Sequence, residues 1–329
     1  MQKRIESTVV ILIGAGLIAL ALFTQLFTRA PAFEELTDDF RPVMTNESIA
    51  TMRSDLEGMQ AMTTEMRTVM LPDIAAALQM EPEALSTYLG ENFPATTRGM
   101  EQLPGITDQF MGMSNTLSLQ RENFEAADAI PTASLPATVF PWGLAAVGAL
   151  TMLVGIFMLR TTHAGSYVAL ALGILMIGGA FLMSWPSKTS KADDMNLALR
   201  NVMTTEQVVG AQGALVVVSE MGTEMQEQML PALATDMGMT ESEMAAYITG
   251  NYPAVGAMFE AMDEVQTRFD GMVGTMSANL DNYDTIKPLS MEPINWFFVA
   301  AGVLIAFAGG LALLAPFSLR RHHPAVTTH

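Results

Sequence analysis

Methionine is the residue type whose spacing in this chain most resembles a chemical site. The sequence has 28 methionines and no cysteine, and one group consists of Met59, Met62, Met66 and Met70. Thioether sulfur binds Cu(I), which is a soft cation. The same steps of three and four residues place the side chains on one helix face, where methionine packs irregular apolar interfaces. No cysteine or histidine accompanies the group, so we interpret it as a packing face and predict no metal site.

Other residue types give no catalytic pattern. The histidines lie in two short segments, 161–166 and 318–329, at positions His163, His322, His323 and His329. None has the H-x-x-x-H spacing of a zinc site on a helix. The acid pairs Asp38-Asp39 and Asp193-Asp194 are alternative Ca²⁺ ligands, but their surroundings do not match a calcium-binding loop. We therefore predict no catalytic residue, no metal and no cofactor, and a protein that is not an enzyme.

Four long apolar runs are the elements that would position any site. They contain no charged residue and extend over Thr8–Thr28, Val139–Leu159, Tyr167–Trp185 and Trp296–Phe317. About 20 apolar residues in a helix cross a hydrocarbon core of ~30 Å. The sequence predicts an all-α integral membrane protein with four transmembrane helices. For the first run the alternative is a cleaved signal peptide, because Ala30-Pro31-Ala32 resembles a cleavage site; the length of the run favours a retained span.

The charges predict the orientation in the membrane. Of the 34 acids, 33 lie in segments 30–135 and 187–293, whereas the short segments carry Lys3, Arg4, Arg160, Arg320 and Arg321. By the positive-inside rule the N- and C-termini are cytoplasmic and both long segments are extracytoplasmic. We expect a multi-pass protein of the plasma (cytoplasmic) membrane. A chain with many acids and few lysines also suggests a prokaryotic source, and its net charge of −18 argues against nucleic acid as a partner.

These features divide the chain into eight segments. The predicted order is the cytoplasmic N-terminus with the first span (1–29), a first outer domain (30–138), a second span (139–160), a cytoplasmic loop (161–166), a third span (167–186), a second outer domain (187–294), a fourth span (295–317) and a cytoplasmic tail (318–329).

The two long segments repeat one another. Residues 70–80 read MLPDIAAALQM and residues 229–239 read MLPALATDMGM, an offset of 159 (229 − 70). At this offset 26 of the 95 positions 37–131 are identical without a gap. The first span aligns with the third, and with a short gap the second aligns with the fourth. We interpret this as a tandem duplication of one unit, span–outer domain–span, whose copies share one membrane orientation, unlike inverted repeats.

Each outer domain is predicted to be a helical hairpin. Apolar residues recur at steps of three and four, the period of packed, coiled-coil-like helices. Thr45 is a predicted N-cap, and Thr240 with Glu243 forms a predicted capping box. Pro72 and Pro231 are expected to end or kink the first long helix of each copy. Pairing of the two hairpins would bury both apolar stripes in an elongated helical bundle.

Two groups of residues are candidates for binding or packing. The aromatic residues Tyr88, Phe93, Tyr247 and Tyr252 recur at the predicted tips of both hairpins. They are interpreted either as a local core that closes each hairpin or as anchors for a partner. In the fourth span, Gly302, Ala306 and Gly310 form a ridge of small residues that favours close packing of membrane helices.

The sequence as a whole favours assembly over chemistry. We expect a non-enzymatic structural or interaction protein of the cell envelope, acting through oligomerisation or as a subunit of a membrane complex. Its expected partners are membrane lipids, further copies of the chain or other envelope proteins. The alternative is a sensor or transport accessory that holds a hydrophobic ligand or lipid between helices. The absence of charge from the predicted spans argues against an ion channel or pump. The plan is similar to that of prominin-type membrane proteins, an architectural likeness that carries no function.

Overall fold

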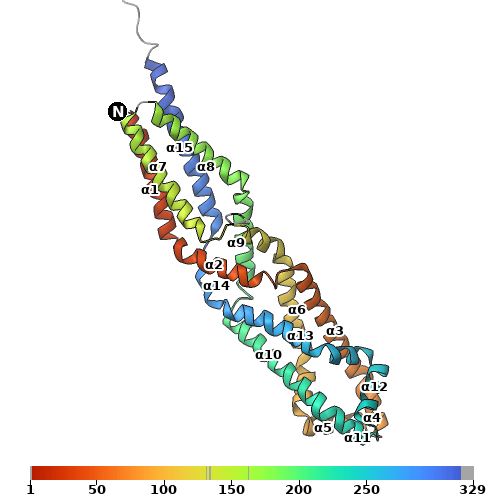
Figure 1. Ribbon diagram of the computed structural model, residues 1–329. Coiled ribbons are helices and arrows are strands. Elements are labelled where there is room, and N and C mark those ends of the chain that lie inside the picture. The colour runs from red at the N-terminus through yellow and green to blue at the C-terminus, as the bar shows by residue number, and fades with distance from the viewer. Residues whose placement is uncertain (1, 131, 133–134, 162, 320–329) are drawn as a thin grey trace, which may run out of the picture. The chain divides into compact units, whose positions relative to one another are not determined.

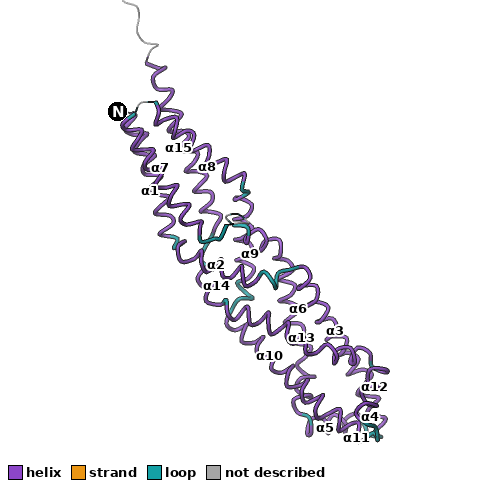
Figure 2. The backbone as a smooth tube through the Cα atoms, viewed as in Figure 1, coloured by secondary structure: helices purple, strands orange, loops and turns teal. Residues whose placement is uncertain are grey.

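The computed structural model describes residues 2–130, 132, 135–161 and 163–319. Almost all of these residues are helical, and no β-strand occurs among them (Figures 1 and 2). The predicted all-α class is confirmed. The chain divides into two compact units: unit 1 comprises residues 1–38, 122–197 and 281–329, and unit 2 comprises residues 39–121 and 198–280.

Unit 1 contains four helices that are long and apolar enough to cross a membrane. They are α1 (Gln2–Phe23), α7 (Val139–Arg160), α8 (Ala164–Leu182) and α15 (Met291–Leu319). Helix α1 packs along α7, and α8 packs along α15. Contacts between α1 and α15, and between α7 and α8, join these two pairs. The prediction of four apolar helices of membrane-spanning length is therefore confirmed.

The first and third apolar runs contain a break that their hydropathy does not reveal. Helix α1 ends at Phe23, and Gln25 has φ of +53° before α2 (Leu26–Phe40) begins. Ser184 has φ of +55° between α8 and α9 (Trp185–Leu199). A left-handed residue interrupts the helix whatever the polarity of its neighbours. The two breaks lie 159 residues apart (184 − 25), the offset of the sequence repeat.

Unit 2 is built from two series of helices that correspond element by element. The first series is α3 (Asn46–Glu65), the π-helix η1 (Met66–Met70), α4 (Leu71–Ala77), α5 (Pro82–Asn92) and α6 (Pro94–Asp128). The second is α10 (Thr205–Glu224), η2 (Met225–Met229), α11 (Leu230–Asp236), α12 (Glu241–Asn251) and α13 (Pro253–Ala278), followed by α14 (Leu280–Ile286), which belongs almost wholly to unit 1. Every start in the second series follows its counterpart by 159 residues.

The predicted helix starts are confirmed. The Thr45 side chain accepts a hydrogen bond from the Ser48 N–H at 3.0 Å. Thr240 and Glu243 form the reciprocal capping box at the start of α12. A side-chain oxygen at these positions satisfies a backbone N–H that has no partner within the helix.

The chain stays helical through the two prolines, at which the sequence predicted that the first long helix of each copy ends or kinks. Each follows a π-helical turn, in which the Leu71 N–H donates to the Met66 carbonyl and the Leu230 N–H donates to the Met225 carbonyl. This i→i−5 spacing widens the helix where proline cannot supply its own N–H. The helices end instead just before Gln79 and Gly238, whose φ values are +55° and +70°.

The interior of unit 2 is rich in methionine. Met62, Met66 and Met70 are at most 1% exposed, and Met225 and Met229 are equally buried. Four of these five methionines belong to the π-helices themselves, and their burial agrees with the packing interpretation.

Candidate functional site

Two equivalent glutamates connect the two series of unit 2. Glu65 Oε2 accepts a hydrogen bond from the Val255 N–H at 2.9 Å, in the first turn of α13. Glu224 Oε2 accepts one from the Thr96 N–H at 2.5 Å, in the first turn of α6. A carboxylate at a helix N-terminus satisfies a free N–H and interacts favourably with the helix dipole. Each series therefore caps the second long helix of the other.

One aromatic pair is formed by the same position of the two series. Phe110 of α6 and Phe269 of α13 are equivalent positions (110 + 159 = 269), and their rings meet edge to face at 5.0 Å. Both are buried. A contact between two copies of the same position implies an approximate twofold relation between the series within unit 2.

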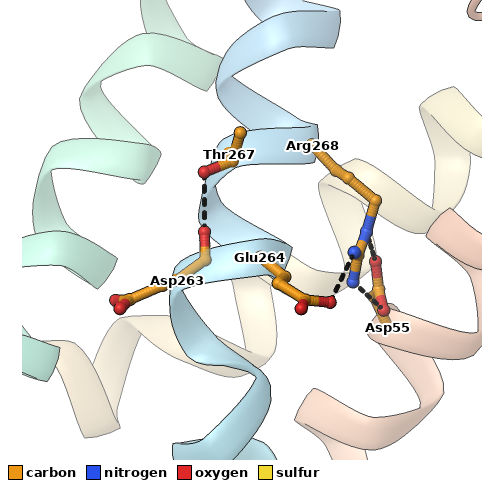
Figure 3. A network of polar contacts seen from close by, with 5 residues as sticks. All are labelled: Asp55, Asp263, Glu264, Thr267 and Arg268. Atoms are coloured by element: carbon orange, nitrogen blue, oxygen red, sulfur yellow. Dashed lines mark hydrogen bonds and ion pairs between the residues drawn. The ribbon is translucent and has the colours of Figure 1, made fainter.

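The ion pair between Arg268 and Asp55 has no counterpart at the equivalent positions of the two series. Arg268 of α13 donates from Nε and Nη2 to the two carboxylate oxygens of Asp55 on α3, each at 2.8 Å (Figure 3). Glu264, one turn earlier on α13, lies 3.5 Å from Arg268 Nη1. The hydrogen bonding of the Arg268 guanidinium to the Asp55 carboxylate is the main cause of the raised pKa of Arg268. The equivalent positions, Ala214 and Gln109, lack charge.

The four predicted tip aromatics lie in or directly after α5 and α12, two of the short helices at one end of unit 2 (Figure 1). Phe93 and Tyr252 are buried, at 5% and 1% exposure, whereas Tyr88 and Tyr247 are half-buried. Tyr88 OH donates to Asp236 at 3.2 Å and Tyr252 OH donates to Asp73 at 3.3 Å. Both bonds run from one series to the other. These aromatics thus contribute to closing unit 2, and only Tyr88 and Tyr247 retain substantial accessible surface.

The ionisation of Tyr252 should make the stability of the fold decrease at alkaline pH. Burial, then the neighbouring Tyr247 and Asp73, raise its pKa. A tyrosine in the unfolded chain ionises near pH 10. The folded state keeps the proton to higher pH, so the stabilisation is complete below about pH 10 and is lost as pH rises above it. We expect Tyr252→Phe, which introduces the residue found at position 93, to weaken the alkaline fall in melting temperature; an unchanged fall would contradict this assignment.

Two equivalent pockets lie beside the π-helices. The larger has a volume of about 350 Å³ between η2, α11, α12 and the start of α13, with Leu230, Pro231 and Met244 among its lining residues. The smaller has about 220 Å³ between η1, α4, α5 and the start of α6, lined by the equivalent Leu71, Pro72 and Leu85. The two pockets lie at matching positions in the two series. π-Helical turns occur frequently at functional sites.

The predicted ridge of small residues lies partly at a helix contact in unit 1. A Cβ placed on Gly173 of α8 would lie 2.5 Å from the Gly302 carbonyl oxygen and 2.8 Å from the Ala306 Cβ. Gly310, however, faces open space, and Gly309 contacts Ser166 and Leu170 instead. Positions 302 and 309 are seven residues apart, two turns on one face, whereas position 310 is rotated away by about 100°. The equivalent contact of α1 with α7 uses Gly14, Gly148 and Gly155.

Two polar residues inside the apolar helices were missed by the sequence reasoning. Glu6 of α1 is 7% exposed and Asn295 of α15 is 3% exposed. None of their side-chain oxygen or nitrogen atoms has a hydrogen-bond partner among the described residues. The uncharged apolar runs begin at Thr8 and Trp296, whereas the apolar helices extend further back and include Glu6 and Asn295. A polar residue one or two positions before an apolar run is the signal that was available, because such groups are costly in a membrane.

No family model, no curated protein and no solved structure matches this chain.

Proposed function

We propose that this chain is a non-enzymatic, membrane-anchored interaction protein of the cell envelope that acts by assembly. The proposal rests on the reciprocal contacts of Glu65 and Glu224, each with the other series. Carboxylates that hold helix N-termini are engaged in structure and are not available to a substrate. What remains accessible on the outer segments is a strongly acidic helical surface.

The proposed architecture is two copies of one unit, each a span, an outer helical hairpin and a second span. The matched π-helices, the left-handed residues at a 159-residue offset and the equivalent glycine contacts support a tandem duplication. In this proposal both hairpins face the extracytoplasmic side and pack together as one elongated bundle. The contact of α3 with α13 and the Phe110–Phe269 pair support this packing.

The charge of the outer segments indicates the chemistry of a partner. Segment 30–135 carries 17 acids against five basic residues, and segment 187–293 carries 16 against five. Such a surface attracts a basic partner and repels nucleic acid and anionic head groups. We propose a basic envelope protein, or an assembly of several copies of this chain with such a protein, in contact with membrane lipids through the spans. A hydrophobic ligand held between the two series is less well supported, because Phe110, Phe269 and the methionines fill that interior.

Isolation of the native protein tests the proposal. The membrane is solubilised in a mild detergent at about 0.1 M salt, and mass is measured by light scattering, with partners identified by mass spectrometry. We expect a particle heavier than the 35.4 kDa chain, with stoichiometric partners that dissociate near 1 M salt, where the Debye length is only about 3 Å. A 35.4 kDa protein component alone at low salt would contradict the proposal.

A further inference from the structure

The two pockets beside the π-helices are formed by equivalent residues of the two series. Each of the nine residues that line the smaller pocket has its equivalent, 159 positions later, in the lining of the larger pocket. The shared apolar wall comes from Leu71 and Leu89 in one pocket and from Leu230 and Ile248 in the other. A difference in chemistry between the pockets can therefore be assigned to individual positions.

The first of these positions is 67, equivalent to 226. Arg67, in the π-helix η1, lines the smaller pocket, and its Nη2 donates to the Met100 carbonyl oxygen at 2.7 Å. The smaller pocket thus has a guanidinium group of the chain itself between η1 and α6. The larger pocket has Gln226 in this place, which is shorter and uncharged, and its volume is about 350 Å³ instead of about 220 Å³.

The second difference is in negative charge. The first residue of α5 is Pro82, whereas the first residue of α12 is Glu241, which lines the larger pocket. Glu260 lines it too, whereas its counterpart Glu101 is not among the lining residues of the smaller pocket. The larger pocket therefore lacks the guanidinium group that the chain supplies to the smaller one, and its lining combines the exposed carboxylates of Glu241 and Glu260 with the apolar Leu230, Met244 and Ile248. Carboxylates bind a guanidinium with charge-assisted hydrogen bonds, and an apolar floor accepts its alkyl stem.

We propose that the pocket between η2, α12 and α13 binds an alkylguanidinium group supplied from outside the chain. The bound group takes the place that the Arg67 side chain holds in the smaller pocket. Its stem lies on Leu230 and Ile248, and its charged head lies between Glu241 and Glu260. This site is independent of the assembly proposed above, since it is formed within unit 2 of a single chain.

Calorimetric titration of the full chain in detergent micelles tests this site. The probe is n-butylguanidinium, and the control probe is the neutral n-butylurea, which has a similar shape. We expect one n-butylguanidinium per chain, with an affinity at least about tenfold above that of n-butylurea, equivalent to 1.4 kcal/mol. Equal affinities of the two probes would overturn the proposal.

Variants assign the binding to the larger pocket. Gln226→Arg places in it the residue that the smaller pocket already has, and we expect it to abolish the binding of n-butylguanidinium. Arg67→Gln is the matched control in the smaller pocket and should leave that binding intact. Should Gln226→Arg fail to fold, Glu241→Gln with Glu260→Gln provides the same test, with an expected loss of about tenfold. Unchanged binding in a variant with the native melting temperature would refute the site.

The source of the guanidinium is distinguished by a third probe, the peptide acetyl-Gly-Arg-Gly-amide. Tighter binding of the peptide than of n-butylguanidinium indicates an arginine side chain of a partner protein. Equal or weaker binding of the peptide indicates a free small cation. Binding of neither cation above the level of n-butylurea overturns the proposal, whatever partners the native protein has.

Discussion

Replacement of Gly173 by leucine is expected to lower the free energy of unfolding by about 3 kcal/mol, the upper end of the range for overpacking. A Cβ at this position would lie 2.5 Å from the Gly302 carbonyl oxygen and 2.5 Å from the Ala306 backbone nitrogen. Backbone atoms of α15 cannot rotate out of the way as a flexible side chain can. Helices α8 and α15 would have to separate and lose the dispersion contacts of close packing.

Gly178→Leu is the matched control for this substitution. Gly178 lies in the same helix, and a Cβ there would meet nothing within 4 Å. Melting temperature and the midpoint of denaturation in detergent should therefore change far less than in Gly173→Leu. Similar losses in the two variants would show that α8 and α15 do not pack at Gly173.

Removal of Arg268 is expected to lower the stability of unit 2 by about 2 kcal/mol. Asp55 is only 11% exposed, and in Arg268→Ala its carboxylate loses both hydrogen bonds from the guanidinium. Breaking a fully buried ion pair by removing one partner costs several kcal/mol. The 32% exposure of Arg268 reduces that cost here through solvent screening. Denaturant unfolding followed by circular dichroism measures the loss.

The repeat itself supplies the controls for this prediction. The double variant Asp55→Ala with Arg268→Gln introduces the residues that stand at the equivalent positions, Ala214 and Gln109, and should recover most of the lost stability. Arg53→Ala removes an exposed ion pair with Glu57, whose side chains are 60% and 63% exposed, and should cost less than about 0.5 kcal/mol. A double variant as unstable as Arg268→Ala would contradict the explanation by an unpaired carboxylate.

Several parts of this structure could be predicted because they depend on local pattern. Long uncharged runs predict the four apolar helices, since length and hydropathy are sufficient for that assignment. Steps of three and four residues predict the buried methionine faces, and Thr45 and Thr240 predict helix starts. These signals lie within a few residues of the feature that they specify.

Other parts depend on partners that lie far away in the sequence. Neither Gln25 nor Ser184 is a glycine, so nothing local marks a left-handed residue between two helices. The hydrogen bonds that the Val255 and Thr96 N–H groups donate to Glu65 and Glu224 become evident only when the two series are placed against each other. One signal was available: both glutamates belong to an identical triplet, residues 64–66 and 223–225, that lies shortly before the identical triplet ending in the proline, residues 70–72 and 229–231.

The pockets show the same division between local and long-range information. The alignment of the two series brings Arg67 opposite Gln226 and Pro82 opposite Glu241. The meaning of these exchanges follows only from the three-dimensional lining, which brings residues 67, 82 and 100 to one pocket and residues 226, 241 and 259 to the other. The sequence identifies the four tip aromatics by residue type alone, and the structure places two of them, Phe93 and Tyr252, in the core.

The central claim is that two copies of one unit share an orientation and present both outer segments on the same side of the membrane. The chain has no cysteine, so single cysteines report their own accessibility without background. Thr64→Cys and Thr223→Cys place them at equivalent, exposed positions of α3 and α10, and His163→Cys places one between α7 and α8. A membrane-impermeant maleimide should label positions 64 and 223 in intact spheroplasts and position 163 only after lysis. Labelling of 64 and 223 from opposite sides would contradict the account.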